Sequence, residues 1–296
     1  MSYPQPLAVI IKMKQDQHII PQVYLKQFGY QDENGIWKVP TYNIDEIKLM
    51  NKIDKTLIRQ SNIKSLLQER NIYDIPTNDE NKSDLEGFLK LTEDNYPQII
   101  EEIKMGNTLS IHNRKMLLGF ISLLFVRTKD YRKILNAVIE NKDYIYLNGI
   151  LDGNKRRIET ILTLPIESAI NFLIAFSGGY IFKCLLNFKV SIIKTISTEK
   201  WSTTDNPVLA IVKTDDQNRF DFMGVNTKMM CPLSPDYLAY IDHKDSNIQL
   251  FPNFEKLVEN RVNKIDNDTF EKIWYKLTDI SRITKYLIAP TERKYK

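Results

Sequence analysis

Short apolar runs at the start of the chain follow a pattern typical of β-strands. The β-branched run 7–13 and the alternating stretch 36–44 each predict a strand. Between them, Pro21 suits the first turn of a helix, and Gly29 suits the position just after the helix ends. We therefore expect one short helix between these two strands.

From about residue 60 to 187 the apolar positions follow helical spacing. One face of the segment 84–103 carries an apolar stripe made of Leu85, Phe88, Leu89, Tyr96, Ile99 and Ile103. Pro97 lies within this segment and is expected to kink or split the helix. The next helix has Ser110 as its N-cap and is apolar nearly all round over 115–126, which predicts the most buried helix of the protein.

A third long helix is expected to follow Pro165 and to break at the Gly-Gly pair 178–179. The segment 168–182 within it carries no charge, but a membrane-spanning helix needs about 20 such residues. Glu167 and Lys183 bound the apolar segment too closely for that. We therefore predict a buried core helix and no membrane partner.

The strand pattern returns in the C-terminal part, in the runs 188–196, 207–214, 228–233 and 237–243. Helices are expected over about 253–263 and 267–278, and a last strand within 282–290. No linker between domains is visible. The sequence therefore predicts a single α+β domain over 1–296, in which a mainly helical middle (about 60–187) separates N-terminal and C-terminal strands that form one mixed sheet.

Composition narrows the class of protein without naming a function. Of the 296 residues, 43% are hydrophobic and 26% are charged, as in globular proteins. The net charge of +4 permits nucleic acid as a partner but does not demand it. The two cysteines, Cys184 and Cys231, cannot form a disulfide framework, and the N-terminus does not resemble a secretory signal. These features predict a cytoplasmic protein, and they leave the oligomeric state open.

His18 and Gln22 are the first candidates for chemistry. His18 is one of three histidines and stands just before the predicted short helix, with Gln22 in its first turn. An imidazole beside an amide can bind a metal, transfer a proton near neutral pH or recognise a substrate. The alternative is that His18 hydrogen-bonds the backbone where the helix begins, and the spacing leaves both open.

Charged residues of the helical middle are the next candidates. Glu86 and Glu93 are seven residues apart, so they project from almost the same side of their helix, where carboxylates can hold a cation or simply be solvated. Arg127, with Arg114 and Arg132 nearby, ends the predicted buried helix. A cation is favourable there by itself, and a phosphate or carboxylate partner is the alternative.

The stretch 201–211, WSTTDNPVLAI, is the strongest local candidate. Asp205 and Asn206 form a turn at the start of a strand, a rigid place for a metal ligand or a general base, or an Asx turn that leads into an edge strand. No Gly-rich phosphate loop, HExxH, GxSxG or CxxC motif occurs. Their absence argues against a P-loop NTPase, a zincin, a hydrolase with a nucleophile elbow and a redox dithiol.

A series of blocks in the chain resembles a bacterial family known as domain of unknown function 4238. In order, the blocks are HIIPQVYLKQF, NIKSLLQERNIYDI, spaced glutamates, FVRTKDYR, STTDNPV and PLSPDYLAY, and they cover about 18–280. The resemblance implies a set of characteristic polar residues, namely His18, Gln22, Glu86, Glu93, Arg127 and Asp205. It supplies no reaction. A set of this kind, drawn from distant segments, is richer than packing requires and suggests one shared pocket.

This set favours a metal-dependent hydrolase of phosphodiester bonds, nuclease-like, as the function. Glu86, Glu93 and Asp205 are expected to bind Mg²⁺ or Mn²⁺, and His18 to act as base or ligand with Gln22 beside it. Arg127 is expected to neutralise phosphate charge. The predicted substrate-binding residues are Arg114, Arg132 and Asn206. By analogy with other such families, an effector role in a bacterial defence or toxin module is expected.

The alternative is a module without catalysis. In that case the same residues bind a nucleotide or nucleic acid, which the aromatic content of 10% and the mild positive charge also fit. A scaffold subunit of a larger complex is a third hypothesis.

Overall fold

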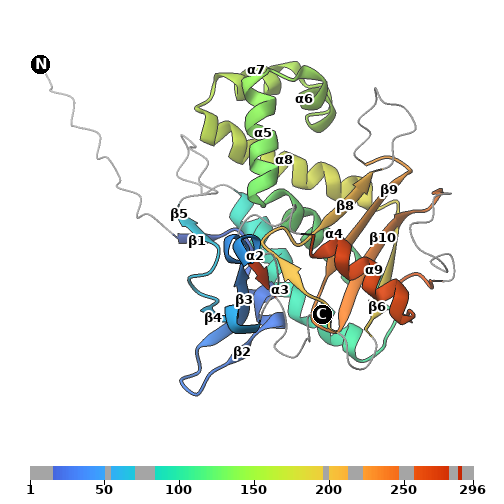
Figure 1. The fold of residues 1–296 in the computed structure, drawn as a ribbon. Helices are drawn as coiled ribbons and strands as arrows, with labels where there is room; N and C mark the ends of the chain where they lie inside the picture. The colour runs from blue at the N-terminus through green and yellow to red at the C-terminus, as the bar shows by residue number, and fades with distance from the viewer. Residues whose placement is uncertain are drawn as a thin grey trace, which may run out of the picture.

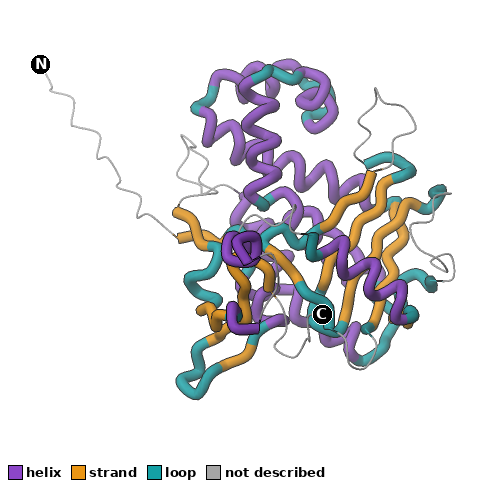
Figure 2. Tube along the Cα trace, viewed as in Figure 1, coloured by secondary structure: helices purple, strands orange, loops and turns teal. Residues whose placement is uncertain are grey.

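The computed structural model describes residues 16–50, 55–70, 84–195, 200–212, 223–246, 257–279 and 286–288, with the backbone alone at positions 16, 50, 55, 70, 84–88 and 212. The strand predicted over 7–13 lies outside these residues. The helices from the middle of the chain gather beside the strands (Figures 1 and 2). The architecture is α+β, as the sequence predicts.

The N-terminal region consists of short elements. In chain order they are β1 (Asp16–His18), α1 (Gln22–Leu25), the 3₁₀ helix η1 (Lys26–Phe28), β2 (Tyr30–Gln31), β3 (Trp37–Asn43), α2 (Ile44–Met50), the 3₁₀ helix η2 (Lys55–Leu57), β4 (Arg59–Asn62) and β5 (Gln68–Arg70). α1 and η1 together confirm the short helix predicted between Pro21 and Gly29. Gly29 ends it for a reason of space, because a Cβ there would lie 2.4 Å from the Lys38 carbonyl oxygen.

The middle region is helical, as predicted. Its helices are α3 (Asp84–Lys104), α4 (Ile111–Val126), α5 (Lys129–Glu140), α6 (Tyr144–Ile150), α7 (Lys155–Thr163) and α8 (Ile166–Leu185). α3 contains Pro97 and continues through it, so the predicted split is wrong. α4 confirms the predicted buried helix: it starts at the Ser110 N-cap, and Leu117 and Ile121 within it have no exposed surface.

α8 runs unbroken through Gly178 and Gly179, so the predicted break is wrong. Gly178 instead allows close packing on α4, because a Cβ there would lie 2.9 Å from Cδ2 of Leu123. By length and composition α8 could cross a membrane, but it packs against α4 to α7, and 56% of its most apolar window is buried inside the protein. It thus contributes to the core, as predicted.

The C-terminal region supplies most of the strands. Its elements are β6 (Phe188–Lys194), β7 (Thr203–Thr204), β8 (Leu209–Val212), β9 (Thr227–Pro232), β10 (Tyr237–His243), β11 (Val262–Lys264), α9 (Asn267–Leu277) and β12 (Tyr286–Ile288). The predicted strand runs correspond to β6, β8, β9, β10 and β12, and the last predicted helix corresponds to α9.

The helix predicted over 253–263 is wrong in its described part. Val262–Lys264 is the strand β11, which pairs with β6 in parallel. The Asn263 side chain donates hydrogen bonds to the carbonyl oxygens of Val258 (3.0 Å) and Arg261 (2.8 Å). Such local bonds stabilise a loop at the expense of a helix.

Two larger sheets organise the fold. One is antiparallel and has the order β2-β3-β12-β7, with β4 also paired to β3. Here N-terminal and C-terminal strands join, as predicted. The other C-terminal strands form a second, mixed sheet in the order β11-β6-β10-β9-β8. The described residues thus form two larger sheets where one was predicted, and β1 and β5 form a separate antiparallel pair.

The second sheet is covered on both faces. Its strands alternate, so Met230 and Tyr240 lie in a cluster with Trp201 and Phe270 of α9, while Met229 and Ile241 belong to the main core with the helices. Figure 1 shows α9 lying across this sheet. The main core extends along the chain from Ile19 to Ile288.

Candidate functional site

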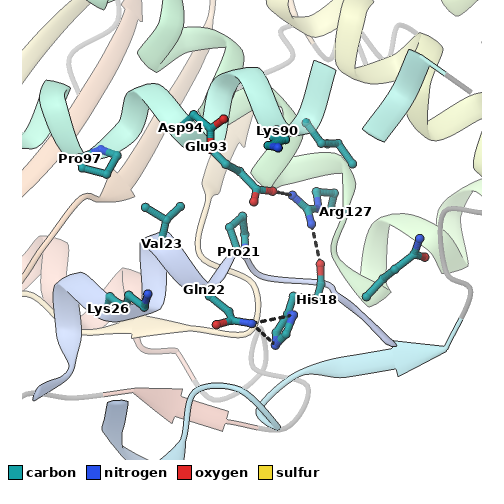
Figure 3. A pocket seen from close by; sticks show the side chains of 12 residues that line it. His18, Pro21, Gln22, Val23, Lys26, Lys90, Glu93, Asp94, Pro97 and Arg127 are labelled. Carbon is teal, nitrogen blue, oxygen red and sulfur yellow. Dashed lines mark hydrogen bonds and ion pairs between the residues drawn. The ribbon is translucent and has the colours of Figure 1, made fainter. Parts of the chain in front are cut away.

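A cleft of about 580 Å³ lies where β1, α1, α3 and the end of α4 meet (Figure 3). The polar residues that line it are Gln17, His18, Gln22, Lys26, Lys90, Glu93, Asp94 and Arg127. They come from three segments that are far apart in the sequence. The fold therefore gathers polar groups here that local structure alone would not bring together.

Arg127 holds these segments in place. It is the C-cap of α4, directly after Val126, and Thr128 is the N-cap of α5. The Arg127 side chain is 5% exposed; Nη1 donates a hydrogen bond to Oε1 of Glu93 (2.6 Å), and Nη2 donates to the carbonyl oxygen of His18 (2.5 Å). A buried guanidinium needs such partners, so Arg127 joins α4, α3 and β1 at the wall of the cleft.

His18 is held in one orientation and in one tautomer. Its Nε2 lies 3.0 Å from the carbonyl oxygen of Lys64. Because a carbonyl only accepts, Nε2 carries the proton and Nδ1 keeps its lone pair. The Gln22 amide nitrogen lies 3.4 Å from Nε2 and 3.5 Å from Nδ1, which are long contacts that a ligand can replace (Figure 3).

The electrostatic setting keeps His18 neutral. Burial lowers the pKa of His18 below its usual value, and Arg127 nearby lowers it further, while the backbone contact with Lys64 opposes the shift. At neutral pH the ring therefore presents an uncharged Nδ1 that can accept a proton.

Three further charged residues line the cleft without having been singled out in the sequence. Lys90 and Asp94 lie on the same face of α3 as Glu93 and Pro97, at the spacing of one helix face. Lys26 lies one turn after Gln22, with its Nζ 5.6 Å from the centre of the Trp37 ring. The helical spacing is a sequence signal that could have found both lysines.

Four of the nine predicted site residues line this cleft, namely His18, Gln22, Glu93 and Arg127. Glu86 lies in α3 two turns before Glu93, and its side chain is outside the described residues.

Asp205 and Asn206 lie elsewhere, directly after β7 in the first sheet. Asp205 is 4% exposed, and its backbone N–H donates to the carbonyl oxygen of Tyr286 (3.2 Å). The backbone N–H of Asn206 donates to Oγ1 of Thr204 (3.0 Å). The segment thus forms the polar turn that the sequence predicts, but neither residue lines the cleft of His18.

Two buried tyrosines connect the elements of the cleft to these strands. The Tyr24 hydroxyl of α1 donates to the carbonyl oxygen of Pro232 (2.8 Å) and accepts from Oγ1 of Thr203 (2.6 Å). Tyr96 of α3 donates to the carbonyl oxygen of Leu233 (2.6 Å). Because α1 and α3 are both fixed to the sheets, the cleft has a rigid base.

Arg114 and Arg132 connect helices at other places. Arg114 donates to the carbonyl oxygen of Phe188, at the start of β6. Arg132 of α5 donates to Oδ1 of Asn171 (3.1 Å) and to Oε2 of Glu167 (3.1 Å), both of α8. Neither arginine lines the cleft, and both have structural partners.

The metal set predicted from the sequence is not gathered by the described residues. In the described part of the chain, no three or more His, Cys, Asp or Glu side chains form a group that could hold a metal ion. Glu93 pairs with Arg127, and Asp205 lies outside the cleft. The described donors therefore do not fit a metal centre, and we derive no reaction step through one.

The fold and the cleft define an α+β protein with a histidine–glutamine pair beside a partly buried glutamate–arginine ion pair. A family model described as "Protein of unknown function (DUF4238)" matches residues 16–272, which is most of the chain, so the protein belongs to this family. No curated protein and no solved structure matches the chain.

Proposed function

We propose that the protein is a hydrolase that cleaves phosphodiester bonds in the cleft of His18. The observation that carries this proposal is the position of the His18 ring in a cleft that Lys26, Lys90 and Arg127 also line. Lys64 fixes the ring through Nε2, and Nδ1 meets the Gln22 amide at a long 3.5 Å, a contact that a ligand can replace. In this role a water takes the place of the Gln22 amide at Nδ1, and Nδ1 accepts a proton from it as a general base while the water oxygen attacks phosphorus. The ester P–O bond breaks as the new P–O bond forms, and the leaving oxygen takes up a proton from the His18 imidazolium or from solvent water.

The substrate class follows from the charges around the cleft. Lys26, Lys90 and Arg127 stand against the carboxylates of Glu93 and Asp94. Arg127 is already paired, so the two lysines would bind the phosphate, while Arg127 and Glu93 hold the backbone of His18 in position. Arg127 is thus a positioning residue in this scheme, and not the phosphate ligand expected from the sequence.

Whether the reaction uses the predicted Mg²⁺ or Mn²⁺ is tested by the metal conditions of the experiment below. Glu93 and Asp94 are the described carboxylates of the cleft, and Glu86 belongs to the same helix. A cytoplasmic location and an effector role in a bacterial defence or toxin module also remain predictions.

A second candidate, binding of a nucleotide or nucleic acid without cleavage, has one observation in its favour. Both ring nitrogens of His18 have a neighbour in hydrogen-bonding range, Lys64 on one side and Gln22 on the other. If the Gln22 amide stays at Nδ1 when a ligand binds, Nδ1 is not available to accept a proton. The His18 ring then contributes to ligand binding without acting as a base.

The test compares the wild type with His18→Ala and with the matched control His112→Ala. His112 is exposed on α4 and does not line the cleft. The purified proteins are incubated with DNA, RNA and bis(p-nitrophenyl) phosphate, in Mg²⁺, in Mn²⁺ and in EDTA. We expect His18→Ala to lower turnover about 10²-fold or more, as loss of a general base does, and His112→Ala to leave it unchanged.

Two outcomes would overturn the hydrolase. One is no turnover by the wild type above that of His18→Ala under any metal condition. The other is a rise in thermal midpoint with nucleotides, lost in His18→Ala, without any cleavage, which would establish the binding function instead. Asp205→Ala tests the predicted metal set separately, because stabilisation by Mn²⁺ that disappears in this variant would assign Asp205 to a metal site.

A further inference from the structure

A second cavity lies in the helical region and is separate from the cleft of His18. It has a volume of about 490 Å³ and is formed by α5, α6 and α8, with Met223 at its wall. The two cavities share no lining residue among those described. We call it the α5–α6 cavity.

The walls of the α5–α6 cavity are mainly apolar. Val138, Ile150 and Ile181 form part of them from the core. Ile134 and Ile145 line the cavity as well, although they are 49% and 88% exposed. Exposed apolar side chains beside a concave apolar wall are typical of binding sites, because burying them against a ligand is favourable.

The polar groups of the cavity are few and mostly neutral. The hydroxyls of Tyr131 and Tyr146 lie 2.8 Å apart and share one hydrogen bond. Burial raises the pKa of both tyrosines, so they stay uncharged at physiological pH. The two hydroxyls use one of their two O–H donors in this bond, so one donor and several lone pairs remain for a ligand.

The charges around the cavity disfavour an ionic ligand. Asp143 is the one charged side chain among the described lining residues, and its carboxylate is the N-cap of α6, where it accepts from the Tyr146 N–H (3.1 Å). It would repel an anion, and no cation lines the cavity in the described part of the chain to compensate a buried negative charge.

We propose that the α5–α6 cavity binds a small, uncharged, mainly apolar molecule that carries a hydroxyl or carbonyl group. The apolar walls provide the affinity, and the Tyr131–Tyr146 pair receives the polar group of the ligand. This binding does not depend on the proposed hydrolase activity, because the two sites have no described residue in common.

The test uses the full chain and the neutral dye Nile Red, whose fluorescence rises in apolar surroundings. Decan-1-ol and decanoate then compete with the dye at a pH of about 8, where decanoate is charged. We expect decan-1-ol to displace Nile Red at concentrations about tenfold lower than decanoate does, because the anion is disfavoured at this site. Tyr146→Phe is expected to weaken decan-1-ol several-fold.

Matched variants locate the site. Ile134→Glu places a charge in the cavity wall and is expected to weaken Nile Red about tenfold. Ile111→Glu makes the same change at an exposed isoleucine of α4, outside the cavity, and is expected to leave binding unchanged. If Ile134→Glu lowers the thermal midpoint, Ile145→Glu replaces it, since Ile145 is 88% exposed. Equal displacement by the alcohol and the anion, or equal losses in the cavity and control variants, would overturn the proposal.

Discussion

His18 makes the stability of the protein depend on pH in a defined direction. Burial lowers the pKa of its ring below 6.5, so in the range between the two pKa values the unfolded chain binds a proton that the folded chain does not. The free energy of unfolding should therefore fall as the pH falls from about 6.5 toward the folded-state pKa, and this contribution should be constant below it.

Urea unfolding at several pH values between about 5 and 8 measures this effect. The variant His18→Gln keeps a polar side chain without a titrating group, so its stability should fall less than that of the wild type over the same range. The other titrating groups are common to both proteins. An equal pH dependence in the two proteins would contradict the buried, neutral His18.

The ion pair between Glu93 and Arg127 is expected to stabilise the folded protein. Glu93→Gln removes the charge partner of a guanidinium that is 5% exposed, while the bond from Arg127 to the His18 carbonyl remains. Because Glu93 is itself 29% exposed, we expect a moderate loss of about 1–3 kcal/mol in the free energy of unfolding. Urea unfolding measures the loss.

Glu101→Gln on the same helix is the matched control. Its partner Lys104 is exposed, and the pair is an i, i+3 pair on the surface. Such a pair contributes about 0–0.5 kcal/mol. Similar losses in Glu93→Gln and Glu101→Gln would show that the pair at the cleft is no stronger than a surface pair.

Single residues of the cleft were only partly predictable from the sequence. The resemblance placed His18, Gln22, Glu93 and Arg127 in one set, and all four line the cleft. Asp205 belongs to the same set but lies after β7, outside the cleft. The resemblance names characteristic residues without the distances between them, so it could not predict this separation. The burial that lowers the pKa of His18 also depends on tertiary contacts, so spacing could not predict it.

At the scale of elements, the adjacent glycines of α8 give a prediction with an internal control. A Cβ at Gly179 meets nothing within 4 Å, whereas a Cβ at Gly178 would lie 2.9 Å from Cδ2 of the buried Leu123. Alanine in place of a helical glycine stabilises by about 0.5–1 kcal/mol where there is room for it. Gly179→Ala should therefore raise the thermal midpoint, and Gly178→Ala should raise it less or lower it.

Thermal unfolding followed by circular dichroism compares the two variants. Equal gains would mean that α8 is not held closely against α4 at Gly178. The close packing of α8 on α4 also explains why the predicted break at these glycines was wrong. Helix propensity disfavours glycine inside a helix, but packing between α8 and α4 requires a residue without a side chain at Gly178.

Element boundaries were predictable where a side chain caps the backbone. Ser110 and Asp266 accept hydrogen bonds from the backbone of α4 and α9, and both helices begin where the sequence predicts. The strand β11 was missed because its pairing with β6 comes from a segment about 70 positions earlier. Long-range pairing of this kind leaves no local pattern in three residues.

At the scale of the whole molecule, the antiparallel sheet explains how the two ends of the chain come together. β12 pairs with β3 on one side and with β7 on the other. The sequence predicts that N-terminal and C-terminal strands meet in one α+β domain, and this sheet confirms it. It could not predict that the C-terminal strands divide between two sheets, because the division depends on pairing between segments as distant as β3 and β12, which leaves no local pattern.

The predicted single domain can be tested through cooperativity of unfolding. Trp274 of α9 and Trp201 lie in the apolar cluster between α9 and the second sheet, whereas Trp37 lies in β3 of the other sheet. In a Trp37→Phe variant, fluorescence therefore reports the core under α9, and the far-ultraviolet circular dichroism reports chiefly the helical middle. Because the main core extends from Ile19 to Ile288, the two signals should change at the same urea concentration. The control is that the circular dichroism of Trp37→Phe is unchanged from that of the wild type. Two separate midpoints in this variant would mean that the layer under α9 unfolds independently of the helices. The chain would then contain more than one cooperative unit.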